Sequence, residues 1–190
     1  MRGISVIFFL FVSLLVSAQN VYHFTKGLVA NTNSRYGREA LYTDPLAYQL
    51  YSNTLKTPAE GGELITGENG EALTWKIIEA DSANRFINRG TGRGMRMFLG
   101  GSYLYLTYSS DKVQPALLNI QGASSLYFNG EPHTADPYAS GWLYIPVQLK
   151  KGLNELYIRG GFVKADLSFP SKPVLLNVSD STLPHIIINE

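Results

Sequence analysis

The sequence contains no cysteine. This absence excludes disulfide bonds, thiol nucleophiles and zinc sites built on cysteine. A domain of this size must then be stabilised by the burial of apolar side chains rather than by cross-links. The 190 residues are 45% hydrophobic, which is enough to build the core of one globular domain.

The sequence also lacks a hydrophobic run long enough to span a bilayer. The longest one, Ile4–Val16, has about thirteen residues where about twenty are needed. It follows Arg2 and precedes the small residues Val16-Ser17-Ala18, which is the pattern of a secretory signal peptide. We therefore expect residues 1–18 to be cleaved and the protein to be secreted or periplasmic, with no membrane attachment after cleavage.

Charge is scarce and balanced between the two signs. Charged residues make up 16% of the chain, with 16 Lys+Arg against 15 Asp+Glu. Cleavage of the signal peptide removes Arg2 and leaves the two signs equal. Because nucleic-acid-binding proteins normally present a basic face, no nucleic-acid partner is predicted.

Catalytic motifs are missing as well. Ser102 and Ser124 both lack the G-x-S-x-G pattern of a nucleophile elbow. The three histidines, His23, His133 and His185, lie too far apart in sequence to suggest a zinc pair, and only His133 is a catalytic candidate. An exposed loop position is the preferred interpretation of His133. A glycosidase with paired carboxylates stays open, but no pair stands out. We predict that this chain is not itself an enzyme.

The glycine-rich stretch Asn88–Gly94, N-R-G-T-G-R-G, has the composition of a phosphate-binding loop. Its spacing matches neither G-x-G-x-x-G nor G-x-x-x-x-G-K-[ST], and a strand-like pattern follows it instead of a helix. A hairpin loop is therefore the preferred interpretation.

The stretch from Ser124 to Arg159 carries the clearest β-strand signals. Two turns, Asn129-Gly130 and Lys151-Gly152, separate runs that are rich in β-branched and aromatic residues. The predicted strands cover Leu126–Phe128, Trp142–Leu149 and Leu153–Arg159, with a loop at Glu131–Ser140. The core residues expected from them are Trp142, Tyr144, Ile145, Leu149, Leu156 and Ile158.

Other elements are read from the same kinds of signal. Asp44 followed by Pro45 predicts the start of a two-turn helix, because aspartate caps helices and proline suits the first turn. Trp75 is expected in the core. Further strands are predicted at Val21–Phe24, Glu63–Ile65, Leu73–Ile78, Tyr103–Tyr108, Ala116–Ile120 and Phe162–Phe169.

The tyrosines of the Tyr103–Tyr108 strand have two interpretations. We place Tyr103, Tyr105 and Tyr108 on one face and two leucines on the other, as in an amphipathic sheet. An exposed stripe of tyrosines that stacks on sugar rings is the alternative.

Five residues around the Glu131–Ser140 loop are candidate ligand-binding residues. Tyr138 and Trp142 could stack on carbohydrate, with Asn129 or Asp136 bonding hydroxyl groups. Asn129, Glu131 and Asp136 could instead bind Ca²⁺, although their spacing matches no defined calcium loop. No other metal or cofactor is predicted.

Three motifs in this region resemble a known family. Y-F-N-G-E-P at Tyr127–Pro132, D-P-Y at Asp136–Tyr138 and I-P-V-Q-L-K-K-G-L-N-E-L at Ile145–Leu156 are similar to those of galactose-binding-like β-sandwich modules in exported bacterial hydrolases. In particular, the chain resembles the N-terminal module of exported α/β-hydrolase and prolyl-oligopeptidase-like proteins.

The resemblance extends over most of the chain, since Asp44-Pro45, Trp75 and Asp180–Pro184 also have counterparts in that family. It implies an all-β, jelly-roll-like sandwich that does no catalysis itself. It also implies a downstream catalytic domain in the same polypeptide, such as a serine hydrolase, esterase or peptidase.

These observations together predict a signal peptide at residues 1–18 and a β-sandwich module with one short helix at residues 19–169. Residues 170–190 are expected to be a linker and the start of a further domain, because Ile186–Ile188 is a strand-like run at the end of the sequence. The expected function is that of an accessory or docking module of a secreted hydrolase. Carbohydrate binding is the alternative.

Overall fold

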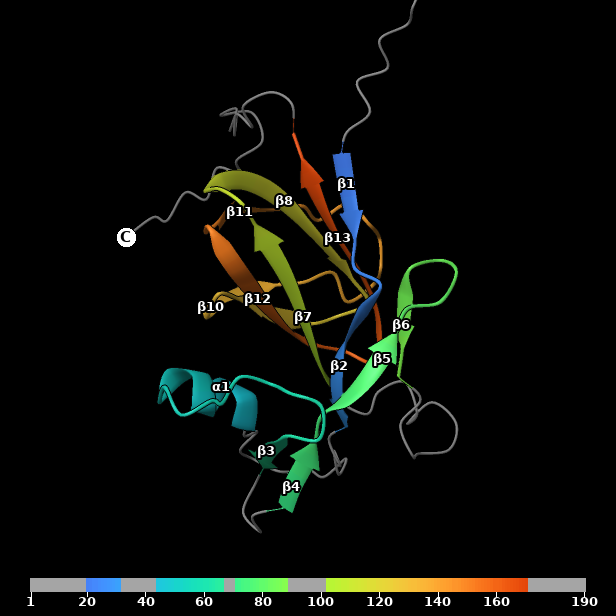
Figure 1. The fold of residues 1–190 in the computed structure, drawn as a ribbon. Coiled ribbons are helices and arrows are strands. Elements are labelled where there is room, and N and C mark those ends of the chain that lie inside the picture. The colour runs from blue at the N-terminus through green and yellow to red at the C-terminus, as the bar shows by residue number, and fades with distance from the viewer. Residues whose placement is uncertain (1–19, 32–43, 67–70, 89–101, 171–190) are drawn as a thin grey trace, which may run out of the picture.

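The computed structural model describes residues 20–31, 44–66, 71–88 and 102–170. These residues form an all-β sandwich with one short helix, which confirms the predicted fold class (Figure 1). The predicted signal peptide, the glycine-rich loop after Asn88 and the C-terminal segment from residue 171 lie outside the described residues. Within the described part, no helix is both long and hydrophobic enough to pass through a bilayer.

Two antiparallel sheets form the layers of the sandwich, and we name them sheet A and sheet B. Sheet A has the order β1-β13-β8-β11, with β6 also paired to β13; its strands are β1 (Asn20–His23), β6 (Arg85–Ile87), β8 (Gln114–Gln121), β11 (Ile145–Leu149) and β13 (Phe162–Phe169). Sheet B has the order β10-β9-β12-β7-β2-β5; its strands are β2 (Lys26–Asn31), β5 (Lys76–Glu79), β7 (Ser102–Ser110), β9 (Ser125–Phe128), β10 (Glu131–Thr134) and β12 (Gly152–Arg159).

The path of the chain through the two sheets is that of a jelly roll. If the segment from β2 to β6 is set aside, the remaining strands form two layers, β1-β13-β8-β11 and β7-β12-β9-β10. Every neighbouring pair in these layers is antiparallel, and the chain crosses between layers at each step except the β9–β10 hairpin. This is the double-sheet arrangement of jelly rolls, and it confirms the predicted architecture.

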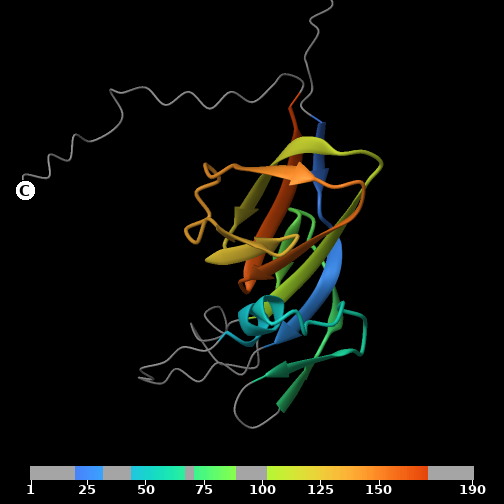
Figure 2. The same cartoon turned by 90° about the vertical axis from the view of Figure 1, so that its left-hand side faces the viewer.

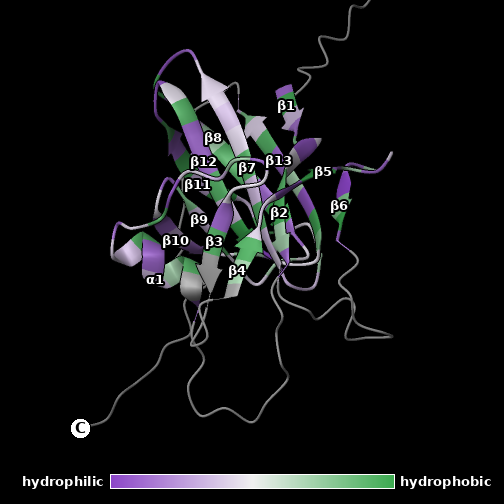
Figure 3. Ribbon diagram, turned by 60° about the horizontal axis from the view of Figure 1, so that its bottom comes forward, coloured by the Kyte–Doolittle hydropathy of each residue, from purple (hydrophilic) through white to green (hydrophobic). Residues whose placement is uncertain are grey.

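The main core lies between the two sheets. Strands mix hydrophobic and hydrophilic residues along their length (Figure 3), and the hydrophobic ones on the facing sides are buried. Four of the six predicted core residues belong to this cluster: Ile145, Leu149, Leu156 and Ile158.

A second, smaller core covers the outer face of sheet B. The helix α1 (Pro45–Tyr51) and the hairpin of β3 (Glu63–Thr66) with β4 (Glu71–Thr74) lie over this face (Figure 2). The buried residues of this cluster are Ala30, Leu46, Leu64, Trp75, Tyr103, Tyr105 and Tyr157. Sheet B is therefore covered by apolar side chains on both faces at this point.

Asp44 fixes the helix to the sheet. Its Oδ1 accepts hydrogen bonds from the backbone N–H groups of Leu46 and Ala47, at 3.1 and 3.2 Å, and from the hydroxyl of Tyr103 at 2.5 Å. Its Oδ2 lies 3.3 Å from Nη1 of Arg159. The predicted helix start is confirmed, and the same carboxylate also anchors the helix to β7 and β12.

Two strand predictions need correction. The run Leu73–Ile78 is two strands, β4 and β5, because the chain leaves the outer hairpin and enters sheet B at Trp75. There the Trp75 N–H donates to the carbonyl of Gly62, and the Trp75 carbonyl accepts from the N–H of Gly61, both at 2.9 Å. Tyr108 does not share a face with the other two tyrosines of its strand. It lies two positions after Leu106 and four after Leu104, so its side chain points to the same face as theirs and packs toward the main core.

The two ends of the described domain lie side by side. Asn20 of β1 is paired with Phe169 of β13 at the same edge of sheet A (Figure 1). Strand β13 runs antiparallel to β8, so that Lys164, near its start, is paired with Gln121 at the far end of β8. Lys164 and Phe169 are five positions apart on β13, which is about 16 Å of strand.

Candidate ligand-binding site at residues 136–144

The five candidate ligand-binding residues fall into two groups. Asn129 and Glu131 lie at the tip of the β9–β10 hairpin, whereas Asp136, Tyr138 and Trp142 follow its other end. At about 3.3 Å per residue, the chain from Glu131 to Asp136 covers roughly 16 Å. The structure therefore does not bring Asn129, Glu131 and Asp136 around one point where they could share a calcium ion.

The predicted loop at Glu131–Ser140 is wrong in its first half, which is strand β10. Asn129 and Gly130 have φ angles of 50° and 89°, both in the left-handed region. Two such residues form the tight turn whose twist matches that of paired strands, so the chain returns directly alongside β9. Sequence reasoning recognised the turn but not the second strand that it implies.

Both polar atoms of the Asn129 side chain form hydrogen bonds within the fold. Its Nδ2 donates to Oδ1 of Asn154 at 3.0 Å, and its Oδ1 accepts from the backbone N–H of Glu155 at 3.0 Å. These contacts tie the hairpin tip to β12. Glu131 is exposed beside it. Asn129 therefore has a structural role in the arrangement described here.

Asp136 closes the loop that follows β10. Its buried Oδ2 accepts a hydrogen bond from the backbone N–H of Gly141 at 2.7 Å and from the hydroxyl of Ser140 at 2.9 Å. Burial opposes ionisation of this carboxyl, but the hydrogen bonds from Gly141 and Ser140 outweigh it and hold the pKa of Asp136 below its usual range. The ionised carboxylate of Asp136 thus links the two ends of the six-residue turn at residues 136–141.

The backbone of Asp136 joins the same turn to sheet A. Its N–H donates to the carbonyl of Ile120 at 3.1 Å, and its carbonyl accepts from the N–H of Gly122 at 2.7 Å. Gly141, at the other end of the turn, has a φ of 78°, and a Cβ there would lie 3.4 Å from Nε2 of Gln121. The contact with Gln121 would be an ordinary one, so it is the left-handed backbone that favours glycine at this position.

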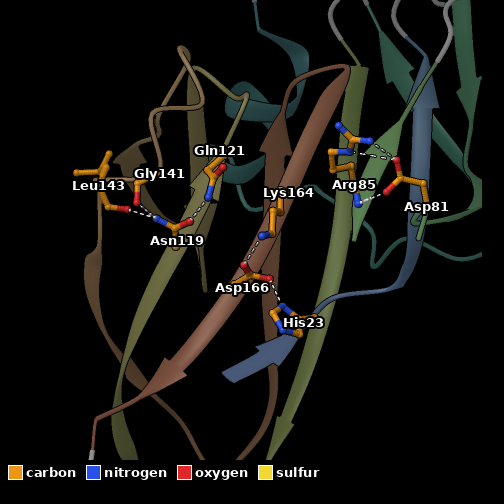
Figure 4. A network of polar contacts seen from close by, with 9 residues as sticks. All are labelled: His23, Asp81, Arg85, Asn119, Gln121, Gly141, Leu143, Lys164 and Asp166. Atoms are coloured by element: carbon orange, nitrogen blue, oxygen red, sulfur yellow. Dashed lines mark hydrogen bonds and ion pairs between the residues drawn. The ribbon is translucent and has the colours of Figure 1, made fainter. Parts of the chain in front are cut away.

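Asn119 holds the next part of the loop from the outer face of β8. Its Nδ2 donates to the carbonyl of Gly141 at 3.2 Å and to that of Leu143 at 2.8 Å, while its Oδ1 accepts from Nε2 of Gln121 at 2.7 Å (Figure 4). Only 4% of Asn119 is exposed. The two carbonyls flank Trp142, so the backbone on both sides of this residue is fixed by one buried amide.

Three aromatic side chains of this loop are exposed: Tyr138 to 92%, Trp142 to 88% and Tyr144 to 51%. The prediction that Trp142 and Tyr144 belong to the core is therefore wrong. The strand begins only at Ile145, because the carbonyls of Gly141 and Leu143 are bonded to the Asn119 side chain instead of to a strand ladder.

The outer face of sheet A continues from this loop as a polar surface. Asp166 is paired in register with Asn119, Lys164 with Gln121, and His23 with Asp166. Nδ1 of His23 lies 2.6 Å from Oδ1 of Asp166, and Nζ of Lys164 lies 3.6 Å from its Oδ2 (Figure 4). Neither Asn119 nor Gln121 was among the candidate residues. Their alternation with Leu118 and Ile120 was the signal that could have placed them on the outer face.

The tyrosines of β7 do not form an exposed platform. Tyr103 and Tyr105 are buried in the second core, and Tyr105 also donates to Oε1 of Glu155 at 2.8 Å. Burial first, and then the hydrogen bonds to Asp44 and Glu155 respectively, raise the pKa of both tyrosines far above the usual value. The amphipathic-sheet interpretation is also wrong for these two residues, because Leu104 and Leu106 on the opposite face of β7 are buried as well.

His133 is not in an exposed loop, since it lies on β10 and is partly buried. Its Nε2 is buried and has no hydrogen-bond partner within the described residues. In the same part of the chain, no group of three or more histidine or acidic side chains gathers as a metal site.

No protein-family model and no curated protein sequence matches this chain. The resemblance noted from the motifs thus stays a prediction, and the function must be argued from the residues of the site.

Proposed function

We propose that this domain is a non-catalytic carbohydrate-binding module whose ligand stacks on the aromatic side chains of residues 136–144. The observation that carries this proposal is the state of Trp142, which is 88% exposed while the backbone on both sides of it is held by Asn119. A large aromatic side chain exposed to water does not stabilise the fold that presents it. An exposed indole on a backbone that is held in place is suited to bind an apolar face of a ligand.

Sugar rings fit this surface better than a fully apolar ligand does. Tyrosine and tryptophan combine an apolar ring with one polar group, so they can stack on a sugar face and bond a hydroxyl at its edge. Tyr138 and Tyr144 lie on either side of Trp142 in the chain, and the polar face of sheet A begins beside them. Because Asp136 and Asn119 hold the loop before any ligand arrives, little conformational entropy is lost on binding.

A role as an accessory or docking module of a secreted hydrolase is the second proposal, and it is compatible with the first. The motif resemblance supports it, and so does the pairing of Asn20 with Phe169, which brings both ends of the domain to one edge. A domain joined at that edge leaves Asn119 and Gln121, beside the aromatic loop, about 10 to 16 Å away along the strands. Attachment and ligand binding would then use different parts of the surface.

The test is retention of the purified protein on a panel of polysaccharides: cellulose, xylan, β-mannan, galactan and polygalacturonate. Trp142→Ala should lower the affinity for whichever polysaccharide is retained by about fivefold or more, because stacking on an aromatic ring contributes about 1 kcal/mol. Tyr51→Ala is the matched control, since Tyr51 is equally exposed but lies on α1.

Retention that Trp142→Ala abolishes and Tyr51→Ala leaves unchanged would support the binding proposal. If no polysaccharide is retained, or if Trp142→Ala binds like the wild type, the aromatic loop is not a carbohydrate site. Docking would then be the better account of the domain.

A further inference from the structure

The polar surface beside the aromatic loop crosses sheet A from one edge to the other. Gln121 of β8 is paired with Lys164 of β13, and Lys164 is paired with Arg85 of β6. Strands in a sheet are about 4.8 Å apart, so these three residues span roughly 10 Å from the loop toward β6. Figure 4 shows the side chains of this row and of the next, Asn119–Asp166–His23, on one face of the sheet.

Several groups in these rows keep hydrogen-bonding capacity toward solvent. Gln121 uses its amide nitrogen on Asn119 and keeps a carbonyl oxygen that can accept further bonds. The ammonium of Lys164 has three N–H donors. The carboxylate of Asp166, whose Oδ2 lies 3.6 Å from Nζ, does not use all three. The imidazole of His23 contacts Asp166 through Nδ1 and is 44% exposed. The face thus offers both donors and acceptors to hydroxyl groups.

The charges on this face balance one another. Lys164 and His23 both contact Asp166, and Arg85 contacts Asp81 at 3.1 Å through Nη2. Lys164 and Arg85, the lysine and the arginine of these two rows within the described residues, therefore each have a carboxylate within ion-pair distance. A face with paired charges offers hydrogen bonds to hydroxyl groups but little net attraction for an anion.

From these placements we infer that the outer face of sheet A extends the aromatic site and binds a neutral polysaccharide chain laid across the strands. One end of the chain stacks on the Trp142 loop, and its other units lie over Gln121 and Lys164 toward β6. This inference rests on the proposed carbohydrate-binding function and adds to it the ligand class, an internal stretch of a neutral glycan instead of a single terminal sugar.

The experiment is isothermal titration of the purified full chain with di- and hexasaccharides of the cello-, xylo- and manno- series, and with oligogalacturonates of the same two lengths. The best neutral hexasaccharide should bind about tenfold or more tightly than its disaccharide. Its affinity should change less than about twofold between roughly 0.05 M and 0.5 M salt, because no net charge attracts it.

Lys164→Met keeps the hydrocarbon stem of the side chain and removes the ammonium. It should weaken hexasaccharide binding several-fold and leave disaccharide binding at the loop unchanged. Lys151→Ala, a change at an exposed turn lysine between β11 and β12, is the matched control and should alter neither. Unfolding curves of both variants report whether the domain keeps its stability.

Two outcomes overturn the extended site while the aromatic site stands. One is Trp142-dependent binding that is equally tight for di- and hexasaccharides. The other is a preference for oligogalacturonates that weakens as salt is added. If none of the oligosaccharides binds at all, the proposed carbohydrate-binding function fails together with this inference.

Discussion

Two regions of this domain carry clusters of aromatic side chains, and one cluster is buried while the other is exposed. On the outer face of sheet B, Tyr103, Tyr105 and Trp75 are buried beneath α1 and the β3–β4 hairpin. On the loop beside sheet A, Tyr138 and Trp142 are almost fully exposed. The same residue types therefore serve as core in one place and as surface in the other, and the elements that cover them decide which.

An aspartate fixes the backbone in each region. Asp44 caps α1 and binds Tyr103, so the helix is held down over the tyrosines. Asp136 accepts from Gly141 and Ser140, so the loop is held in a turn that leaves its aromatic residues in solvent. We propose that the first cluster contributes stability and the second contributes ligand binding, and substitutions can separate these two roles.

Trp75→Ala should have the largest effect on stability. The side chain is 2% exposed and packs with Tyr105 at the point where the chain enters sheet B. Removal of such a side chain leaves a cavity and should lower the free energy of unfolding by about 3–5 kcal/mol. Urea unfolding followed by circular dichroism measures this. A loss below about 1 kcal/mol would mean that the second core adds little to the fold.

The second-largest effect on stability should come from alkaline pH, through the ionisation of the buried tyrosines. Burial raises the pKa of Tyr103, Tyr105 and Tyr157 far above 10, whereas in the unfolded chain they ionise near 10. Their contribution is therefore complete below about pH 10 and is lost as the pH rises beyond it. The free energy of unfolding should fall by about 3 kcal/mol by pH 11, or roughly 1 kcal/mol for each group.

Unfolding curves at successive pH values test this alkaline loss. Tyr103→Phe removes one of the three groups and should make the decline with pH shallower by about a third. A stability that is constant up to pH 11 would contradict the burial of these hydroxyl groups.

Asp44→Ala should lower the free energy of unfolding by about 2–3 kcal/mol, because the helix loses its cap and Arg159 loses a carboxylate. Asp44→Asn keeps a capping oxygen and should cost about 1 kcal/mol. Chemical denaturation of the two variants gives both values. Equal losses would show that the cap matters less than the charge.

Asn119→Leu should affect the loop more than the fold. The substitution keeps the volume of the side chain but removes its bonds to the carbonyls of Gly141 and Leu143, and it should cost about 1–2 kcal/mol. Hydrogen exchange should become faster across residues 136–144 and stay unchanged in β12. If exchange in the loop does not change, Asn119 does not position Trp142.

Trp142→Ala should have the smallest effect on stability, within about 0.5 kcal/mol, because the side chain lies almost wholly in solvent. Thermal unfolding of this variant beside Trp75→Ala compares the two tryptophans of the chain directly. A loss above about 1.5 kcal/mol would mean that Trp142 packs against the domain, and the proposed binding surface would lose its main support.

Local signals predicted much of the fold. Asp44-Pro45 was sufficient for the start of α1, and the alternation along Leu153–Arg159 was sufficient for β12. The pairing of strands was harder to foresee, because Lys26–Asn31 and Arg85–Ile87 are short segments without a strong pattern that become strands beside β7 and β13. Such short strands depend on a neighbouring strand that already offers its hydrogen bonds.

The candidate site was predicted only in part. Asp136, Tyr138 and Trp142 were chosen for their chemistry, and the structure places them on one loop. Asn119, which holds that loop, comes from a strand 17 residues before Asp136 and had no local signal beyond its alternation with leucine and isoleucine. A contact between a strand and a later loop depends on how the chain returns, which spacing along the sequence does not record.

The sequence by itself determined the elements with local causes: the capped helix, the Asn129-Gly130 turn and the β-strands with alternating burial. These follow from backbone conformation and side-chain periodicity within a few residues. The tertiary structure alone decided which aromatic residues are core and which are surface, because exposure depends on what covers a side chain. Tyr103 is covered by a helix that starts 58 residues earlier, and Trp142 is left open by a loop that Asn119 and Asp136 hold in place.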